Sequence, residues 1–156
     1  MSVNKKLQQI LLQRKENNSL RSLSFTRHLI DFSSNDYLSF ARDEDHKHKI
    51  IQRFSQQQFH IGSTGSRLIS GNSEFAEELE QKIARFHKSE AALIFNSGYD
   101  ANVGFFSAVP QRNDVILYDE LCHASIRDGI QMSHAKSYKF QHNDYEDLEA
   151  KISKIQ

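Results

Sequence analysis

The sequence has 156 residues, in which 20 Lys and Arg residues balance 20 Asp and Glu residues, and no block of like charges favours nucleic acid or an anionic membrane as a partner. No stretch approaches the roughly 20 apolar residues of a membrane span, and residues 1–15 lack the apolar core of a signal peptide. The single cysteine, Cys122, excludes an internal disulfide and fits a reducing compartment, so we expect a soluble, cytoplasmic protein.

The N-terminal part of the chain is expected to begin with a helix. Apolar residues recur at helical spacing within residues 1–15, at Val3, Leu7, Ile10 and Leu11. Residues 30–34 predict a short strand that turns at Asn35 and Asp36. Polar residues with scattered apolar ones then predict a surface helix within residues 43–59.

Residues 62–71 predict a loop, because they hold three of the six glycines. The spacing of these glycines does not match the dinucleotide-binding fingerprint. The loop could bind phosphate through backbone N–H groups, or it could be a rigid surface loop capped by Arg67. A polar cap at Asn72 or Ser73 then predicts a helix whose core face comprises Phe75, Leu79, Ile83 and Phe86.

Strands alternate with helices over the rest of the chain. We predict strands at 91–96, 114–118 and 136–140 and helices at 99–108, 123–132 and 144–155. This alternation indicates βαβ units and a mostly parallel sheet, the α/β fold class. Ligands of such sheets bind at the carboxyl ends of the strands.

Two candidate site segments follow predicted strands. Gly98 and Tyr99 start a helix, where free backbone N–H groups favour a phosphate, although an ordinary turn would also use a glycine. His123 starts the next helix, where it could stack on a flat cofactor or shuttle a proton, or simply cap the helix. We interpret Cys122 as a small packing residue rather than a nucleophile. Residues 142–144 have side chains of kinds that can bind a metal ion, but a role in capping the next helix explains them better.

Five segments, in one order, closely resemble the α-oxoamine synthase family of pyridoxal-phosphate enzymes. They are Asp-Phe-Ser-Ser-Asn-Asp-Tyr-Leu at 31–38, Gly-Ser-Thr-Gly-Ser-Arg at 62–67, Asn-Ser-Gly-Tyr-Asp-Ala-Asn at 96–102, Cys-His-Ala-Ser-Ile at 122–126 and Phe-Gln-His-Asn-Asp at 140–144. The resemblance implies a fold-type-I transferase, like aspartate aminotransferase. It divides the chain into an N-terminal helix and arm, 1–42, and the first part of the large sheet domain, 43–156. It also implies a pyridoxal 5'-phosphate cofactor, a homodimer with the 62–71 loop at its interface, and condensation of an amino acid with an acyl thioester with loss of CO₂.

The resemblance assigns roles residue by residue. Gly98 and Tyr99 would bind the cofactor phosphate, and His123 would stack on its pyridine ring, contact substrate and act in catalysis. Arg21 would serve the acyl substrate, and Asn35 would lie near substrate. No metal is implied.

The chain also departs from the family pattern. Cys122 stands where a serine is usual, and the segment between Arg21 and Phe32 is shorter than is common. The family's cofactor-binding lysine and its pyridine-nitrogen aspartate would fall beyond residue 156. We therefore expect the chain to be the N-terminal portion of a longer enzyme, inactive alone. The rival interpretation is a non-catalytic partner subunit that lacks the lysine.

Overall fold

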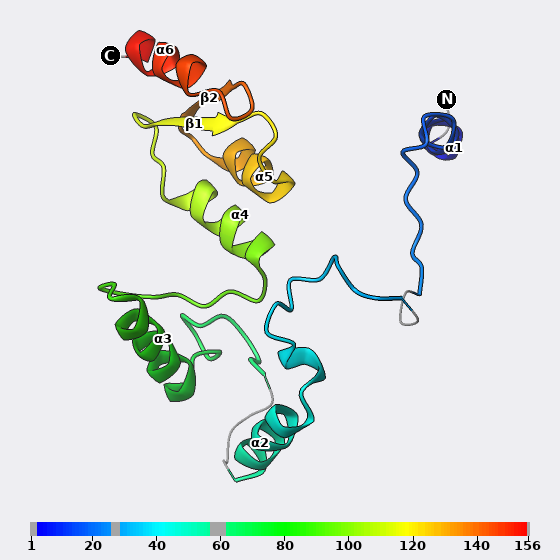
Figure 1. The fold of residues 1–156 in the computed structure, drawn as a ribbon. Helices are drawn as coiled ribbons and strands as arrows, with labels where there is room; N and C mark the ends of the chain where they lie inside the picture. The colour runs from blue at the N-terminus through cyan, green and yellow to red at the C-terminus, as the bar shows by residue number, and fades with distance from the viewer. Residues whose placement is uncertain (1–2, 26–28, 57–61, 156) are drawn as a thin grey trace. The chain divides into compact units, whose positions relative to one another are not determined.

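The computed structural model describes residues 3–25, 29–56 and 62–155 and divides the chain into two compact units, Met1–Phe59 and His60–Gln156 (Figure 1). No helix among these described residues is long and apolar enough to cross a membrane. The predicted boundary between an arm and a larger domain at residue 42 stays a prediction.

The described residues of the first unit form two α-helices, α1 (Val3–Glu16) and α2 (Glu44–Ser55), and a short 3-10 helix, η1 (Phe40–Arg42). Both α-helices were predicted. The start of α2 is fixed by Asp43, whose side chain accepts a hydrogen bond from the backbone N–H of His46 at 2.9 Å. Such a cap satisfies one of the free donors of the first helical turn.

The predicted strand at residues 30–34 is wrong. The carboxylate of Asp31 accepts hydrogen bonds from the backbone N–H groups of Ser33 and Ser34, each at 3.0 Å. These bonds, that of Ser33 above all, lower the pKa of Asp31 to about 2. Because the side chain takes the donors that a strand would offer to a neighbour, the segment forms a local turn instead.

The second unit contains four α-helices and two strands in its described residues, and most follow the predicted alternation. They are α3 (Glu74–His87), α4 (Gly98–Ala108), β1 (Val115–Asp119), α5 (Ala124–Met132), β2 (Lys136–Phe140) and α6 (Tyr145–Ile155). The strands β1 and β2 pair in parallel, with Val115 opposite Lys136 and Asp119 opposite Phe140. The α/β class with a parallel sheet is thereby confirmed.

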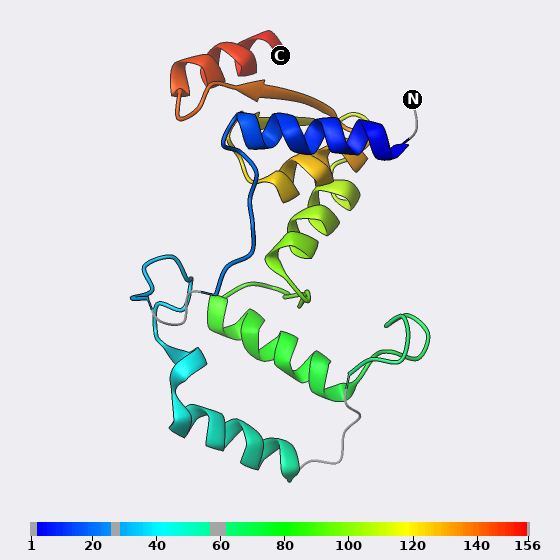
Figure 2. The same cartoon turned by 90° about the vertical axis from the view of Figure 1, so that its right-hand side faces the viewer.

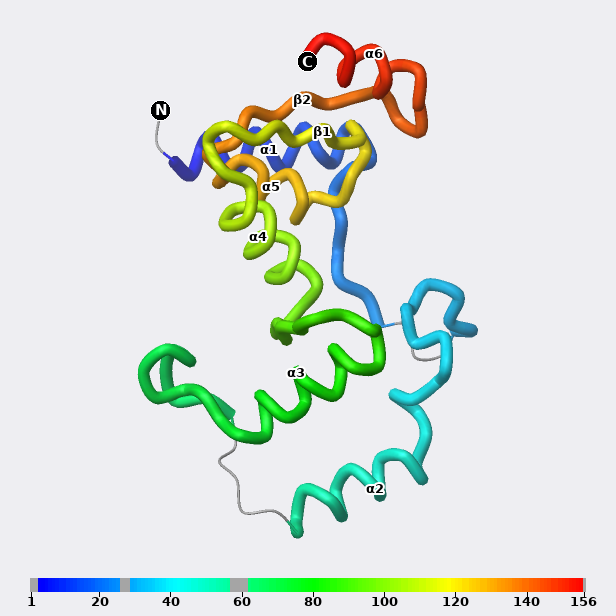
Figure 3. The backbone as a smooth tube through the Cα atoms, turned by 90° about the vertical axis from the view of Figure 1, so that its left-hand side faces the viewer, coloured from blue at the N-terminus to red at the C-terminus, as the bar shows by residue number. Residues whose placement is uncertain are grey.

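The helices of this unit cover both faces of the strand pair. In Figures 1 and 2, α6 lies on one side of β1 and β2, and α5 lies on the other side, with α4 beyond it. Figure 3 shows the same succession, from α6 through the two strands to α5 and then α4. Helix α6 contacts β2, and α4 packs against α5.

The predicted strand at 91–96 is also wrong. The backbone N–H of Ile94 donates to the Glu80 side chain of α3 at 2.9 Å rather than to a neighbouring strand. A β-strand needs a neighbouring strand to exchange backbone hydrogen bonds with. In the described part of the chain the strands are β1 and β2, which pair with each other. The segment is therefore an irregular connection.

The core of the described residues is small and lies in the second unit. Ala84, Ile116 and Ile130 are its buried apolar side chains. The predicted core face of α3 is wrong at Phe75, Leu79 and Phe86, which are exposed, whereas Ile83 is half-buried. The most extensive contacts within the described residues join α4 to α5 and β1 to β2, with a smaller one between α6 and β2, and none of them covers α3.

Candidate functional site

The start of α4 presents free hydrogen-bond donors. Ser97 caps this helix, and its Oγ accepts from the backbone N–H of Asp100 at 3.1 Å while the Ser97 hydroxyl donates to the Asp100 carboxylate at 2.9 Å. Among the described residues, none accepts a hydrogen bond from the N–H of Gly98 or Tyr99. Unpaired N–H groups at a helix N-terminus form a site suited to an anion.

The surroundings of Gly98 leave room for a ligand. Its φ lies outside the left-handed region, so the turn itself does not demand a glycine. A Cβ added there would meet nothing within 4 Å. The space beside the two free N–H groups is therefore open, and a phosphate group fits the donors present.

His123 is the N-cap of α5. Its Nδ1 accepts from the backbone N–H of Ser125 at 3.2 Å and lies 2.7 Å from Ser125 Oγ. The cap uses only Nδ1, and Nε2 has no hydrogen-bond partner among the described residues, so Nε2 is available to a ligand. Capping and ligand stacking are therefore compatible roles for His123.

Tyr99 connects the two segments. Its ring meets the His123 ring edge-on, with centroids 6.3 Å apart and an interplanar angle of 79°. Its hydroxyl donates a hydrogen bond to the carboxylate of Asp128 on α5. This bond, with burial and the nearby negative charge, raises the pKa of Tyr99. The phenol therefore stays neutral, and Tyr99 holds the start of α4 against α5.

The turn after β1 is fastened to the turn after β2. The carboxylate of Asp119 accepts from the backbone N–H groups of Leu121 at 2.7 Å and Asn143 at 3.0 Å. It also accepts from His142 Nδ1 at 3.0 Å. The bond from Asn143, followed by that from His142, lowers the pKa of Asp119. The residues between β1 and His123 are thus held at the carboxyl edge of the sheet.

Cys122 and the segment at residues 142–144 both have structural roles beside the candidate site. Cys122 is half-buried, and burial raises the pKa of its thiol, which supports a packing role rather than a nucleophile. The cap of α6 is Asp144, whose Oδ1 accepts from the backbone N–H of Asp147 at 2.9 Å. A helix cap therefore accounts for this segment, as predicted.

Residues 62–71 form a loop, as predicted, and its contacts favour the rigid-loop interpretation. Ser63 Oγ donates to the carbonyl of Gly65 at 2.7 Å, and the N–H of Gly71 donates to the carbonyl of Ser66 at 2.9 Å. A Cβ at Gly71 would overlap the Gly65 carbonyl. Arg67 binds Glu80 of α3 and so fastens the loop to that helix.

Two predicted site residues, Arg21 and Asn35, lie in the first unit. Both are exposed, in the segment between α1 and η1. Their roles toward substrate stay predictions.

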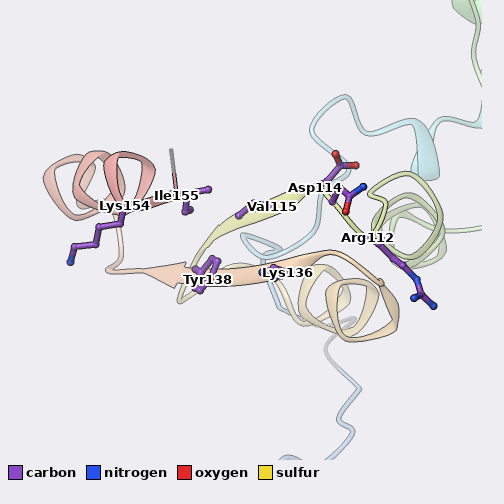
Figure 4. Close-up of a pocket in the computed structure, with 8 residues that line it drawn as sticks. Arg112, Asp114, Val115, Lys136, Tyr138, Lys154 and Ile155 are labelled. Atoms are coloured by element: carbon purple, nitrogen blue, oxygen red, sulfur yellow. The ribbon is translucent and has the colours of Figure 1, made fainter.

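A cavity of about 400 Å³ lies at the opposite edge of the sheet (Figure 4). Val115 and Lys136, the first residues of β1 and β2, line it, whereas His123 follows the other end of β1. The complete lining is Arg112, Asn113, Asp114, Val115, Lys136, Tyr138, Lys154 and Ile155. Because ligands of parallel sheets bind at the carboxyl ends of strands, this cavity is not the predicted cofactor site.

Sequence analysis missed three side chains of the site: Asn102, Ser125 and Asp128. The first two stand in the segments that carry the family resemblance, but their sequence pattern does not show that they contact each other. Asp128 lies one helical turn beyond Ala124 on α5, a position that looks like an ordinary exposed helix residue.

The aminotransferase class I and II family matches residues 27–156. An 8-amino-7-oxononanoate synthase of Emericella nidulans is 48% identical over 124 residues, which are 78% of this chain and 30% of that protein. A solved 8-amino-7-oxononanoate synthase of Francisella tularensis is 31% identical with a TM-score of 0.61, covering 78% of this chain and 33% of that one.

A solved structure of SPT (serine palmitoyltransferase) with PLP is 33% identical with a TM-score of 0.59. It covers 65% of this chain and 25% of that one. The chain spans about a third of the length of the curated relatives that it matches.

Proposed function

The chain belongs to the class I and II aminotransferase family, and we propose that it serves a pyridoxal-phosphate-dependent acyltransferase, 8-amino-7-oxononanoate synthase, of biotin biosynthesis. The reaction joins L-alanine to a pimeloyl thioester and releases CO₂ and the free thiol. The observation that carries this proposal is the pair of free N–H groups at Gly98 and Tyr99, beside the capped ring of His123.

The residues present fit a phosphorylated aromatic cofactor. Gly98 and Tyr99 would bind its phosphate through their N–H groups, and His123 would stack on its ring. When bound, pyridoxal phosphate supplies the electron sink for cleaving and forming bonds at the amino-acid α-carbon. The solved SPT that contains PLP supports this choice of cofactor.

This chain's own residues would orient the reactants and handle protons. The hydrogen bond from the Ser125 N–H restrains the rotation of the His123 ring, so that a flat ligand would meet a preorganised surface. The Nε2 atom of His123, which the cap leaves available, is the atom at which a proton would be held or moved. Arg21 would bind the acyl substrate, and Asn35 would contact substrate.

The proposal includes a homodimer in the cytoplasm. In it, the loop at residues 62–71 would lie at the dimer interface, near the site of the second subunit. The rigid contacts of this loop suit an interface, and the single cysteine fits a reducing compartment.

A second candidate is another α-oxoamine synthase, and the similarity to SPT favours a serine-using member. Such a member would join serine to a long acyl chain, and others would join glycine to an acetyl or succinyl thioester. A non-catalytic partner subunit is the remaining alternative.

The test uses the full-length gene product that carries this sequence. It is titrated with pyridoxal phosphate, followed by absorption, and then given alanine with pimeloyl-CoA, glycine with acetyl- or succinyl-CoA, or serine with palmitoyl-CoA. We expect stoichiometric cofactor uptake and CO₂ release with alanine and pimeloyl-CoA. Turnover only with serine or only with glycine would overturn the assigned member. A folded protein that ignores the cofactor would overturn the enzyme and favour the partner subunit.

A further inference from the structure

We propose that Asn102 and Ser125 are positioning residues that hold His123 in the tautomer with its proton on Nε2. The proposal rests on the role proposed for His123 at the cofactor. Neither positioning residue needs to touch the cofactor, because both act through the imidazole.

His123 Nδ1 acts as a hydrogen-bond acceptor. The backbone N–H of Ser125 points at this atom from 3.2 Å. A backbone N–H can only donate, so Nδ1 must accept. A neutral imidazole carries one proton, and here that proton must be on Nε2.

The Ser125 hydroxyl links His123 to Asn102. Its Oγ lies 2.7 Å from Nδ1, and because Nδ1 accepts, the hydroxyl must be the donor. Its oxygen is then free to accept, and the side-chain amide nitrogen of Asn102 donates to it at 3.0 Å. All three bonds therefore run in one direction, from Asn102 through Ser125 to His123.

Because these hydrogen bonds are buried, the loss of any one of them costs free energy. The Ser125 residue is fully buried and Asn102 is half-buried, so an unmade bond would leave a polar atom without water. These hydrogen bonds can connect α4 to α5 because Gly129, four residues beyond Ser125, lets the two helices lie close to each other. A Cβ at Gly129 would come within 2.9 Å of the Asn102 carbonyl oxygen.

The consequence is a defined polarity at the proposed site. With Nδ1 occupied by two donors, Nε2–H is the side of the ring that faces a ligand as a hydrogen-bond donor. The ring can therefore give a proton or a hydrogen bond at Nε2 without first changing tautomer.

The decisive variant is Asn102→Asp, which keeps the shape and reverses the polarity. A carboxylate can only accept, so it competes with Nδ1 for the Ser125 hydroxyl proton. When the hydroxyl donates to the carboxylate, Oγ becomes an acceptor for Nδ1–H, and only the backbone N–H of Ser125 still favours the Nε2–H tautomer. Ser125→Ala removes the hydroxyl but keeps the backbone cap, so its effect should be smaller. Asn113→Asp, on an exposed residue at the other edge of the sheet, adds the same charge away from the chain of bonds and is the matched control.

The measurement is ¹⁵N NMR of the histidine-labelled full-length gene product without cofactor, at a pH of about 9, where an ordinary imidazole is neutral. His123→Gln identifies the signal. We expect the Nε2–H tautomer in the unaltered protein and in the control. The ratio of Nδ1–H to Nε2–H should rise a few-fold in Ser125→Ala and about tenfold or more in Asn102→Asp, as expected for one or two exchanged hydrogen bonds.

Three results would overturn the proposal: an Nδ1–H tautomer in the unaltered protein, a ratio unchanged in Asn102→Asp, or an equal rise in Asn113→Asp. If Asn102→Asp does not fold, Ser125→Ala decides by the same ratio, and no change overturns the proposal. The readout needs no cofactor. Failure to bind pyridoxal phosphate would therefore overturn the proposed function and leave the tautomer result standing.

Discussion

Glu80 and Arg67 form a bidentate ion pair between α3 and the loop at residues 62–71. The guanidinium nitrogens of Arg67 donate to the two carboxylate oxygens of Glu80 at 2.7 and 3.0 Å. One of these oxygens also accepts from the backbone N–H of Ile94 at 2.9 Å. A single carboxylate thus joins the loop, α3 and the segment that leads to the start of α4.

The first prediction follows from the charge of Glu80. The bond from Arg67, followed by that from Ile94, lowers the pKa of Glu80 below its ordinary value of 4.5. Its contribution to stability is therefore present above pH 4.5 and is lost as the pH falls through the lowered pKa. Glu80→Gln should destabilise the protein at pH 7, and the difference from the unaltered protein should shrink below pH 4.5.

Denaturant unfolding of the full-length gene product at several pH values measures this difference. Glu78→Gln is the control, because Glu78 lies on the same helix and is exposed. The same dependence on pH in both variants would contradict the assignment to the Glu80–Arg67 pair.

The second prediction concerns the contact between α4 and α5. A Cβ at Gly129 would lie 2.9 Å from the Asn102 carbonyl oxygen and 3.1 Å from Val103 Cα, both backbone atoms that cannot rotate away. Gly129→Ala should therefore force the helices apart and cost about 1–3 kcal/mol of the free energy of unfolding. Chemical denaturation measures the loss, and a variant as stable as the unaltered protein would show that the two helices are less closely packed.

The helices could be predicted from the sequence because their signals are local. Ser73 and Ser97 cap α3 and α4 with side chains that reach an N–H only three residues away. A strand has no such local signal. Residues 91–96 have an apolar strand pattern, but whether they form a ladder depends on neighbours that the pattern does not name.

The site shows the same division. Gly98 and His123 stand at turns between predicted elements, so their positions were found from the sequence. The contact between Asn102 and Ser125 was not, because it depends on how closely α4 and α5 pack at Gly129. The turn at Asp31 was missed for the opposite reason: a side-chain bond to the backbone two residues on outweighed a weak strand pattern.

The third prediction separates the phosphate site from stability. Because a Cβ at Gly98 meets open space, Gly98→Ala should leave the free energy of unfolding unchanged or slightly raised. If a phosphate approaches the N–H groups there, the added methyl group should weaken pyridoxal-phosphate binding. Absorption titration of the full-length gene product measures affinity, with denaturation as the matched control. Unchanged affinity would argue against a phosphate at this turn.

The last prediction tests the ring of His123. His123→Ala removes the stacking face and should weaken pyridoxal-phosphate binding by roughly 2- to 10-fold, since aromatic pairing contributes about 0.5–1.5 kcal/mol beyond burial. His123→Phe should recover much of that affinity but not the rate of CO₂ release, because phenylalanine has no Nε2–H. His134→Ala, an exposed histidine between α5 and β2, is the control. If both His123 variants keep the affinity and the rate of the unaltered protein, His123 serves only as the cap of α5. If Phe restores both, the ring stacks but its Nε2 proton takes no part in the reaction.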